Sequence, residues 1–306
     1  MILKTANLKG FGEKHKGKVR DYYIAGNELI LITTDRISAF DSVLGYIPYK
    51  GQVLNLLSKF WFEKTSDIIE NHMISVPHPN VMIAKHAKQI PIEMVVRGFI
   101  TGVTSTSIWG SYEKGERVIY GITFPDGLLK NQKLEKPVIT PTTKPEVGHD
   151  QRLTREEILK KKIVPEEIYK QMETAALKLF EKGQEVSLKN GLMLVDTKYE
   201  FGLLDGKVIL IDEIHTPDSS RFWIKKTYTS RFKNGEEPES FDKEVLRIWY
   251  KERGYTGDGT PPKMTQDFIK MLSNRYIDMY EIVTGKKFQK TEGVTSMSIQ
   301  KALNTI

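Results

Sequence analysis

A glycine-flanked basic turn near the start of the chain could bind phosphate. Residues 12–18 (GEKHKGK) have the G-x-x-x-x-G-K spacing of a P-loop. Val19 stands where a P-loop needs serine or threonine for magnesium, and residues 19–24 predict a strand instead of the required helix. A glycine turn between two strands can still cover phosphates, as in protein kinases, with Lys18 and Arg20 on one side of the strand. The alternative is an ordinary basic hairpin on the surface.

Carboxylates stand at the ends of two predicted strands in the second half of the chain. Glu200 follows one apolar run, Asp212 ends the next, and Asp205 with Gly206 between them favours a hairpin. Two carboxylates close together repel each other unless a cation or a proton intervenes, and magnesium prefers oxygen ligands and substrate phosphates. Lys198 lies two residues from Glu200 and could face the same phosphates. The alternative is that these are solvated charges in turns.

A single arginine follows in a loop of small hydroxyl residues. Arg221 lies in residues 215–223 (HTPDSSRFW). A guanidinium group can bind phosphate through two parallel hydrogen bonds, which suits this position. An arginine that only braces its loop carbonyls is the alternative.

Several other kinds of site are excluded or disfavoured by the sequence. The chain has no cysteine, so disulfides, thiolate nucleophiles and cysteine metal sites are excluded. None of the six histidines has H-x-x-x-H spacing, and the sequence has no G-x-S-x-G element. These observations argue against a zinc site and a serine-hydrolase site.

The bulk composition is that of a soluble globular protein. The 306 residues are 39% hydrophobic and 28% charged, with no apolar run of about 18 residues and no signal-peptide pattern. We therefore expect a cytoplasmic protein with no membrane partner. The net charge of +7 fits either nucleic-acid binding or a cleft for anionic small molecules. Basic residues do not cluster strongly, and the densest run is residues 160–162, so we expect no nucleic-acid partner.

The order of predicted elements favours an α+β fold. Strands are expected first, then a mixed middle and a helical tail, which argues against a doubly wound parallel sheet. Residues 137–145, rich in proline and threonine, predict a loop. The expected strands are residues 29–34, 94–96, 192–196 and 208–212. The expected helices are residues 52–64, one opened by the capping box at 154–157, one from Pro165 to Gly183, and one over 264–283.

Five segments together resemble one known family. They are residues 17–22 (GKVRDY), 34–41 (TDRISAFD), 93–98 (EMVVRG), 195–202 (VDTKYEFG) and 212–221 (DEIHTPDSSR). In this order and spacing they resemble the phosphoribosylaminoimidazole-succinocarboxamide synthase, or SAICAR synthetase, family, in its longer yeast-like form. The resemblance covers about residues 11–255, and residues 256–306 carry no motif of the family.

The resemblance implies a two-lobed α+β fold related to ATP-grasp and kinase-like architecture. The implied parts are a β-rich lobe (1–92), a second lobe for ATP and substrates (93–226) and a helical C-terminal segment packed on the second lobe (227–306). The implied reaction joins L-aspartate to carboxyaminoimidazole ribotide with ATP, giving SAICAR, ADP and phosphate in de novo purine biosynthesis. An acyl phosphate is the expected intermediate.

The resemblance also implies the ATP and metal contacts. Gly17, Lys18 and Arg20 match the contacts to the ATP phosphates, and the backbone at Met94 and Val96 would hold adenine. Mg²⁺ would be bound by two sets of carboxylates, with Lys198 beside the first set. These sets are Glu200 with Asp212, and Glu93 with Asp150. The implied catalytic residues are Lys198, Glu200 and Asp212.

Substrate contacts are implied in three places. Arg97 and Arg221 match the residues that hold the ribotide phosphate. Ser105 and Ser107 are both candidates for the serine that assists them. The remaining residues near the substrates are Asp35, Ser38 and Asp41.

Two other functions remain open from the sequence. One is a different ATP-dependent carboxylate–amine ligase on the same fold. The other is a basic anion- or RNA-binding protein without catalysis, which predicts exposed aromatic side chains among basic ones. Phe60 and Trp61 lie instead on an apolar helix face. The sequence does not predict whether the chain is a monomer or a homo-oligomer.

Overall fold

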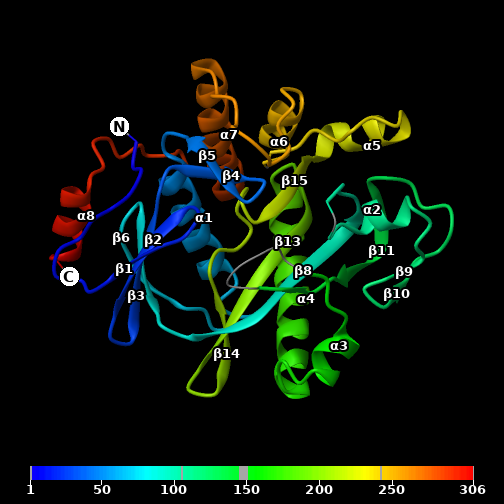
Figure 1. Ribbon diagram of the computed structural model, residues 1–306, viewed down its shortest axis with the longest axis horizontal. Helices are drawn as coiled ribbons and strands as arrows, with labels where there is room; N and C mark the ends of the chain where they lie inside the picture. Colours follow the sequence, from blue (N-terminus) through cyan, green and yellow to red (C-terminus); the bar gives the residue numbers. More distant parts are fainter. Residues whose placement is uncertain (1, 105, 145–150, 242, 306) are drawn as a thin grey trace.

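The computed structural model describes residues 2–104, 106–144, 151–241 and 243–305. Two antiparallel sheets dominate these residues (Figure 1). The first sheet has the order β1-β2-β3-β7-β6. Its strands are β1 (Lys14–Lys16), β2 (Arg20–Ala25), β3 (Glu28–Thr33), β7 (Val81–Lys85) and β6 (Met73–His78).

The second sheet has the order β11-β8-β13-β14, with β12 beside β8 and β15 beside β13. Its strands are β8 (Lys88–Ile100), β11 (Gln132–Ile139), β12 (Thr142–Thr143), β13 (Leu192–Leu204), β14 (Lys207–Ile211) and β15 (Ser220–Ile224). Two small hairpins complete the strands: β4 (Arg36–Ala39) with β5 (Ser42–Tyr46), and β9 (Val118–Ile119) with β10 (Ile122–Thr123). A bridge between Asn71 and Leu210 joins the edges of the two large sheets.

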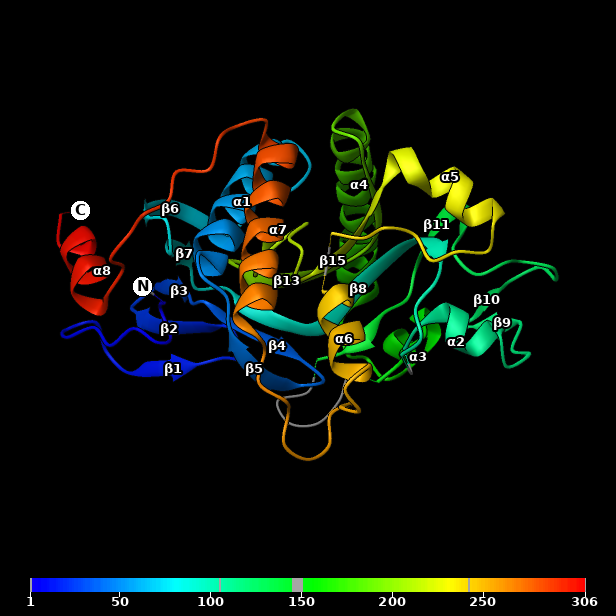
Figure 2. The same cartoon turned by 90° about the horizontal axis from the view of Figure 1, so that it is seen from above.

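Helices flank the sheets, and α1 (Lys50–Lys64) and α4 (Glu166–Lys189) pack directly on them (Figure 2). The long ones are α1, α4 and α7 (Gln266–Thr284). The short ones are α2 (Ile108–Tyr112), α3 (Arg155–Lys160), α5 (Lys225–Lys233), α6 (Glu244–Lys251) and α8 (Ser296–Leu303). Among the residues that the structure describes, no helix is long and apolar enough to cross a membrane.

Most local predictions are confirmed. The predicted strands, the helix at 52–64 and the hairpin at Asp205 and Gly206 are all present, and Thr154 forms a complete capping box with Glu157. The predicted loop at 137–145 is only partly correct. β11 continues through Ile139 and β12 pairs with β8, because both add backbone hydrogen bonds to the edge of that long strand.

Helix α4 does not end at Gly183 as predicted, but continues to Lys189. Gly183 does not end the helix but allows it to pack closely against its neighbours. A Cβ atom at Gly183 would lie 2.5 Å from His215 Cε1 and 2.6 Å from Leu194 Cδ2. The helix therefore approaches β13 and the loop after β14 more closely than any larger residue would allow.

Gly183→Ala should lower the free energy of unfolding by about 1–3 kcal/mol, because the new methyl group overpacks a buried contact. Urea denaturation measures the change. Ser187→Ala, one turn later on the same helix, is the matched control. Ser187 is buried, and its Oγ has no partner among the described residues, so we expect a change within about 0.5 kcal/mol. A Gly183→Ala variant as stable as the parent would contradict the packing argument.

The C-terminal segment does not pack only on the second lobe, as the resemblance implied. Helix α7 packs against α1, and α8 contacts β6 of the first sheet (Figures 1 and 2). The apolar side chains Ile299 and Leu303 of α8 share a buried cluster with Leu3 and with Ile32 of β3. Apolar faces on these helices were predictable, but not the surfaces they would cover.

Candidate active site

A cleft of about 1080 Å³ lies between the two large sheets. Its walls come from β2 and β3 on one side and from β8, β13 and β14 on the other. This volume suits a nucleotide-sized ligand. The cleft brings together the following predicted site residues: Gly17, Lys18, Arg20, Asp41, Glu93, Lys198, Glu200 and Asp212.

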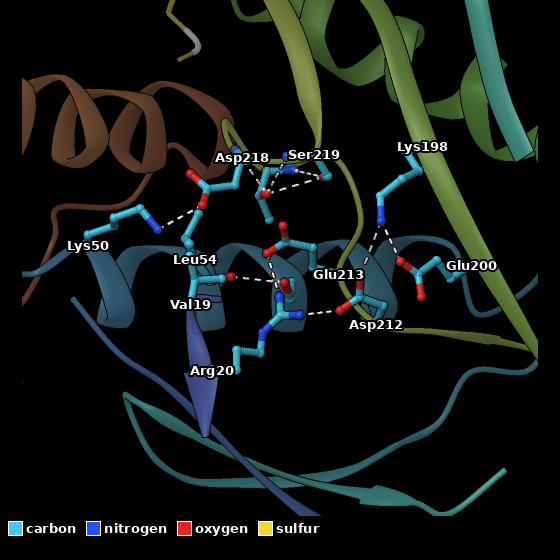
Figure 3. Close-up of polar contacts among 12 residues, drawn as sticks. Val19, Arg20, Lys50, Leu54, Lys198, Glu200, Asp212, Glu213, Asp218 and Ser219 are labelled. Atoms are coloured by element: carbon cyan, nitrogen blue, oxygen red, sulfur yellow. Dashed lines mark hydrogen bonds and ion pairs between the residues drawn. The ribbon is translucent and has the colours of Figure 1, made fainter. Parts of the chain in front are cut away.

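One lysine gathers three carboxylates in this cleft. Lys198 and Glu200 are two apart on β13, so their side chains lie on the same face, and Glu200 pairs with Glu93 of β8. Lys198 Nζ lies 2.8 Å from Glu93 Oε1. It also lies 3.8 Å from Asp212 Oδ2 and contacts Glu200 (Figure 3). The strand register therefore explains how acidic residues far apart in sequence meet at one point.

Arg20 links the first sheet to the carboxylates of the second. It contacts Asp212, and its Nη2 lies 2.5 Å from Glu213 Oε2 (Figure 3). Consecutive side chains of a regular strand point to opposite faces. Asp212 has φ 66°, a left-handed conformation that is costly for aspartate. This bend at the end of β14 lets both neighbouring carboxylates reach one guanidinium group.

The charges in the cleft shift the pKa values of its buried groups. Burial alone would raise the pKa of Asp212, but the cations Arg20 and Lys198 hold that pKa well below its ordinary value. Burial and the negative charge of Asp212 raise the pKa of Glu200, although Lys198 opposes them. Burial would lower the pKa of Lys198, but the surrounding carboxylates raise it well above its ordinary value. Lys198 and Asp212 are therefore charged at neutral pH.

The two predicted magnesium ligands fit a cation that arrives with phosphate. Glu200 and Asp212 both line the cleft and share Lys198. Nowhere in the described ranges do three acidic or histidine side chains form a ready-made metal site. Magnesium usually takes one or two carboxylates and completes its shell with water and phosphate oxygens. The two carboxylates therefore fit a magnesium ion that arrives with phosphate oxygens of its own.

Sequence reasoning missed two residues that contact Glu200. Lys144 forms an ion pair with it, and Gln89 Nε2 donates to Glu200 Oε2 at 2.8 Å. Lys144 follows β12 in the segment predicted as a loop, and no motif marks it. The proximity of Lys144 to Glu200 follows from the pairing of β12 with β8, which the sequence does not show.

The predicted adenine contact does not agree with the structure. Met94 and Val96 are fully buried, and β8 is paired with β13 on one side and with β11 and β12 on the other. The backbone there is occupied by the sheet and does not line the cleft. Apolar side chains line it elsewhere, notably Leu29 and Leu31 of β3 and Ile211 of β14. His86 and Ala87, which connect β7 to β8, form part of the same wall.

The predicted phosphate arginines meet outside the cleft, at Asp196. Arg221 Nη1 lies 2.7 Å and Arg97 Nη1 3.7 Å from Asp196 Oδ2. Arg97 is anchored by Thr140, whose Oγ1 accepts from its Nε at 2.8 Å. Asp196 is four residues before Glu200 on the same face of β13, roughly 13 Å away at about 3.3 Å per residue. One face of the sheet therefore carries the carboxylates around Lys198 and, roughly 13 Å along β13, the pair of Arg97 and Arg221.

Of the two predicted serines, Ser107 lies beside this arginine pair. A Cβ atom on Gly102 would lie 2.8 Å from Ser107 Cβ and 3.7 Å from Arg221 Nη1. Ser107 caps helix α2 by accepting from Gly110 N, and its Oγ donates to Thr104 O at 2.8 Å. Ser105 and Asp150 lie outside the described residues.

The three predicted residues of the segment 34–41 have different surroundings. Asp35 is buried away from the cleft lining and accepts from the backbone N–H groups of Leu3 at 2.8 Å and Gly51 at 3.0 Å. Ser38 is half-buried on β4 and also lies outside the lining. Asp41 lies at the cleft, where its Oδ1 is 2.5 Å from Lys18 Nζ.

An α+β fold with a basic turn facing buried carboxylates across a cleft is the arrangement of an ATP-using enzyme. The chain matches the SAICAR synthetase family over residues 13–263. It therefore belongs to that family, as the sequence motifs indicated.

Individual relatives and solved structures agree with this assignment. The chain is 55% identical over 280 residues to phosphoribosylaminoimidazole-succinocarboxamide synthase of Legionella pneumophila (strain Paris), covering 91% of this chain and 89% of that protein. It is 53% identical over 245 residues to the chloroplastic enzyme of Vigna aconitifolia, covering 80% and 72% of the two chains.

The fold resembles SAICAR-synthase from Saccharomyces cerevisiae complexed with SAICAR, with TM-score 0.82, 32% identity and coverage of 94% of this chain and all of that one. It also resembles a SAICAR synthetase (Type-2) in complex with ADP, with TM-score 0.69, 27% identity and coverage of 91% and 100%.

Proposed function

We propose that the chain is an ATP-dependent ligase that joins L-aspartate to carboxyaminoimidazole ribotide and forms SAICAR, ADP and phosphate in purine biosynthesis. Family membership and relatives of this name over most of the chain support the reaction. The observation that carries the proposal is the cleft in which Lys198 gathers Glu93, Glu200 and Asp212 opposite the basic turn. This arrangement suits phosphoryl transfer, which needs positioning and charge neutralisation more than a protein nucleophile.

ATP would lie in the cleft with its phosphates at Gly17, Lys18 and Arg20. Its adenine would lie against the apolar wall of β3 and Ile211, near the connection at His86 and Ala87. The solved relative in complex with ADP supports nucleotide binding by this fold. Glu200 and Asp212 would hold Mg²⁺, which when bound offsets the charge of the phosphates. The second metal pair, Glu93 with Asp150, stays a prediction.

The ribotide would lie along the face of β13. Its phosphate would bind Arg97 and Arg221 beside Ser107, and its carboxylate would point toward Lys198 and the ATP phosphates. A carboxylate is a poor electrophile, so its oxygen would attack the terminal phosphorus of ATP and give an acyl phosphate and ADP. The aspartate amine would then attack the acyl carbon and release phosphate. The ammonium groups of Lys198 and Lys144 would neutralise charge that develops on the transferred group.

The test is an ADP-release assay on the purified chain. ADP release should require both the ribotide and magnesium, and net amide formation should also require L-aspartate. Removal of magnesium with EDTA should abolish both, and added magnesium should restore them. A folded sample that gives no amide with all substrates present contradicts the proposal. Amide formation with another carboxylate would favour a different ligase, and salt-dependent RNA binding without ATP turnover would favour an anion-binding protein.

A further inference from the structure

A buried arginine lies directly behind the glycine turn. Arg36 is only 3% exposed, yet its guanidinium group donates four hydrogen bonds. Two of them go to turn carbonyls: Nε to Lys18 O at 3.0 Å and Nη2 to Gly17 O at 3.1 Å. The other two go to Lys4 O and Asp21 Oδ1, each at 2.8 Å. This side chain is part of the segment 34–41, which the resemblance placed near the substrates.

These bonds fix the direction of two peptide groups in the turn. In a planar trans peptide, the carbonyl and the following N–H point in opposite directions. Since the carbonyls of Gly17 and Lys18 point to Arg36, the N–H groups of Lys18 and Val19 point away from it. Both of those residues line the cleft. Arg36 is not among the residues that line the cleft. Its bonds therefore hold carbonyl oxygens, which would repel phosphate, on the side of Arg36, and they leave the amide donors on the opposite side of the turn.

The neighbouring residue of the same segment extends this support by one peptide. Val19 O accepts from Thr34 N at 3.0 Å and from Thr34 Oγ1 at 2.7 Å. Three consecutive carbonyls of the turn are thus bonded to Thr34 and Arg36. A guanidinium group can hold two adjacent carbonyls at once because its donors form a rigid planar fork, which a lysine ammonium lacks.

Asp21 fixes the guanidinium group from behind. Asp21 is fully buried, and its Oδ2 accepts from Thr5 Oγ1 at 2.6 Å and from Ala6 N at 2.9 Å. Its Oδ1 faces Arg36. Thr5 and Ala6 of the N-terminal segment are therefore bonded to Asp21 on the side away from the turn.

We propose that Arg36 is a positioning residue for the phosphates of ATP, acting through the backbone of the turn at Gly17 and Lys18. It touches no substrate itself. The inference rests on the proposed function, in which this turn binds the phosphates.

The test compares the KM values for ATP and for the ribotide in Arg36→Lys, which keeps the charge but loses the fork. The KM for ATP should rise about tenfold, as should the dissociation constant for ADP measured by calorimetry. The KM for the ribotide should stay within about twofold. Thr34→Val removes the hydroxyl group that donates to Val19 O and accepts from Arg36 N. This smaller change should raise the KM for ATP by about threefold.

Thr5→Val is the matched control for stability. It removes a hydrogen bond to Asp21 on the side away from the turn, so the melting temperature should fall while the KM for ATP stays unchanged. An unchanged KM for ATP in both Arg36→Lys and Thr34→Val, or an equal rise in both KM values, overturns the inference. Lys18→Ala tests the underlying assignment separately. If ATP affinity is unchanged in that variant, the proposed phosphate site is wrong, whatever Arg36 does.

Discussion

Asp212→Asn should lower kcat by about a hundredfold or more. The substitution keeps the size of the side chain but removes its negative charge. That charge would offset magnesium beside the ATP phosphates. Arg20 keeps its contact with Glu213, so the link between the two sheets remains. Glu200→Gln should have a similar effect, because Glu200 is the other predicted magnesium carboxylate and it also contacts Lys198. Steady-state ADP release at several magnesium concentrations measures both variants.

Asp205→Asn is the matched control for this experiment. Asp205 lies in the exposed turn of the same β13–β14 hairpin, where its φ of 49° suits asparagine equally well. We expect normal activity in this variant and an unchanged melting temperature. Near-normal turnover of both Asp212→Asn and Glu200→Gln at limiting magnesium would refute the metal-binding role.

The parts of the site that follow from local pattern could be predicted from the sequence. The hairpin that brings Glu200 toward Asp212 depends on two apolar runs and the turn at Asp205 and Gly206, all within a short stretch. The presence of Glu93 beside them depends on the pairing of β8 with β13, which are about a hundred residues apart. That register cannot be read from either strand alone, so only the family resemblance brought Glu93 into the predicted site.

The errors have a common physical cause. The resemblance placed adenine at the backbone of residues 94–96, and the sequence does not show that strands pair with β8 on both sides there. Similarly, Asp35 carries a polar side chain in a family motif, but its carboxylate accepts backbone N–H groups inside the fold. A motif shows which residue types occur together. It does not show whether a polar group faces the ligand or supports the chain that does.

The C-terminal helices illustrate the same limit at a larger scale. The spacing of apolar residues over 264–283 correctly predicted a helix with a buried face. Helical period carries no information on the partner of that face. In the structure α7 packs on α1, while α8 joins the N-terminal segment over the first sheet. The family motifs end before these helices, so the resemblance did not supply the missing contacts.

Arg221→Lys and Arg97→Lys should each weaken ribotide binding by about one to two orders of magnitude. A charge-assisted hydrogen bond contributes roughly 1.5–3 kcal/mol, and about 1.4 kcal/mol is tenfold in affinity. Lysine keeps the charge but loses the paired donors that match a phosphate group. ATP affinity should change much less, because the arginines lie outside the cleft, toward the other end of β13.

Titration of each variant with ATP and with the ribotide separates binding from folding. Arg231→Lys on α5 is the matched control. Arg231 forms ion pairs with the exposed acids Glu236 and Glu239, so its replacement should leave both affinities unchanged. Arg221 and Arg97 both contact Asp196, so either variant could instead loosen this part of the sheet. In that case ATP and ribotide affinities would fall in parallel, or the melting temperature alone would fall. Either result would show that the two arginines brace Asp196 and do not anchor the phosphate.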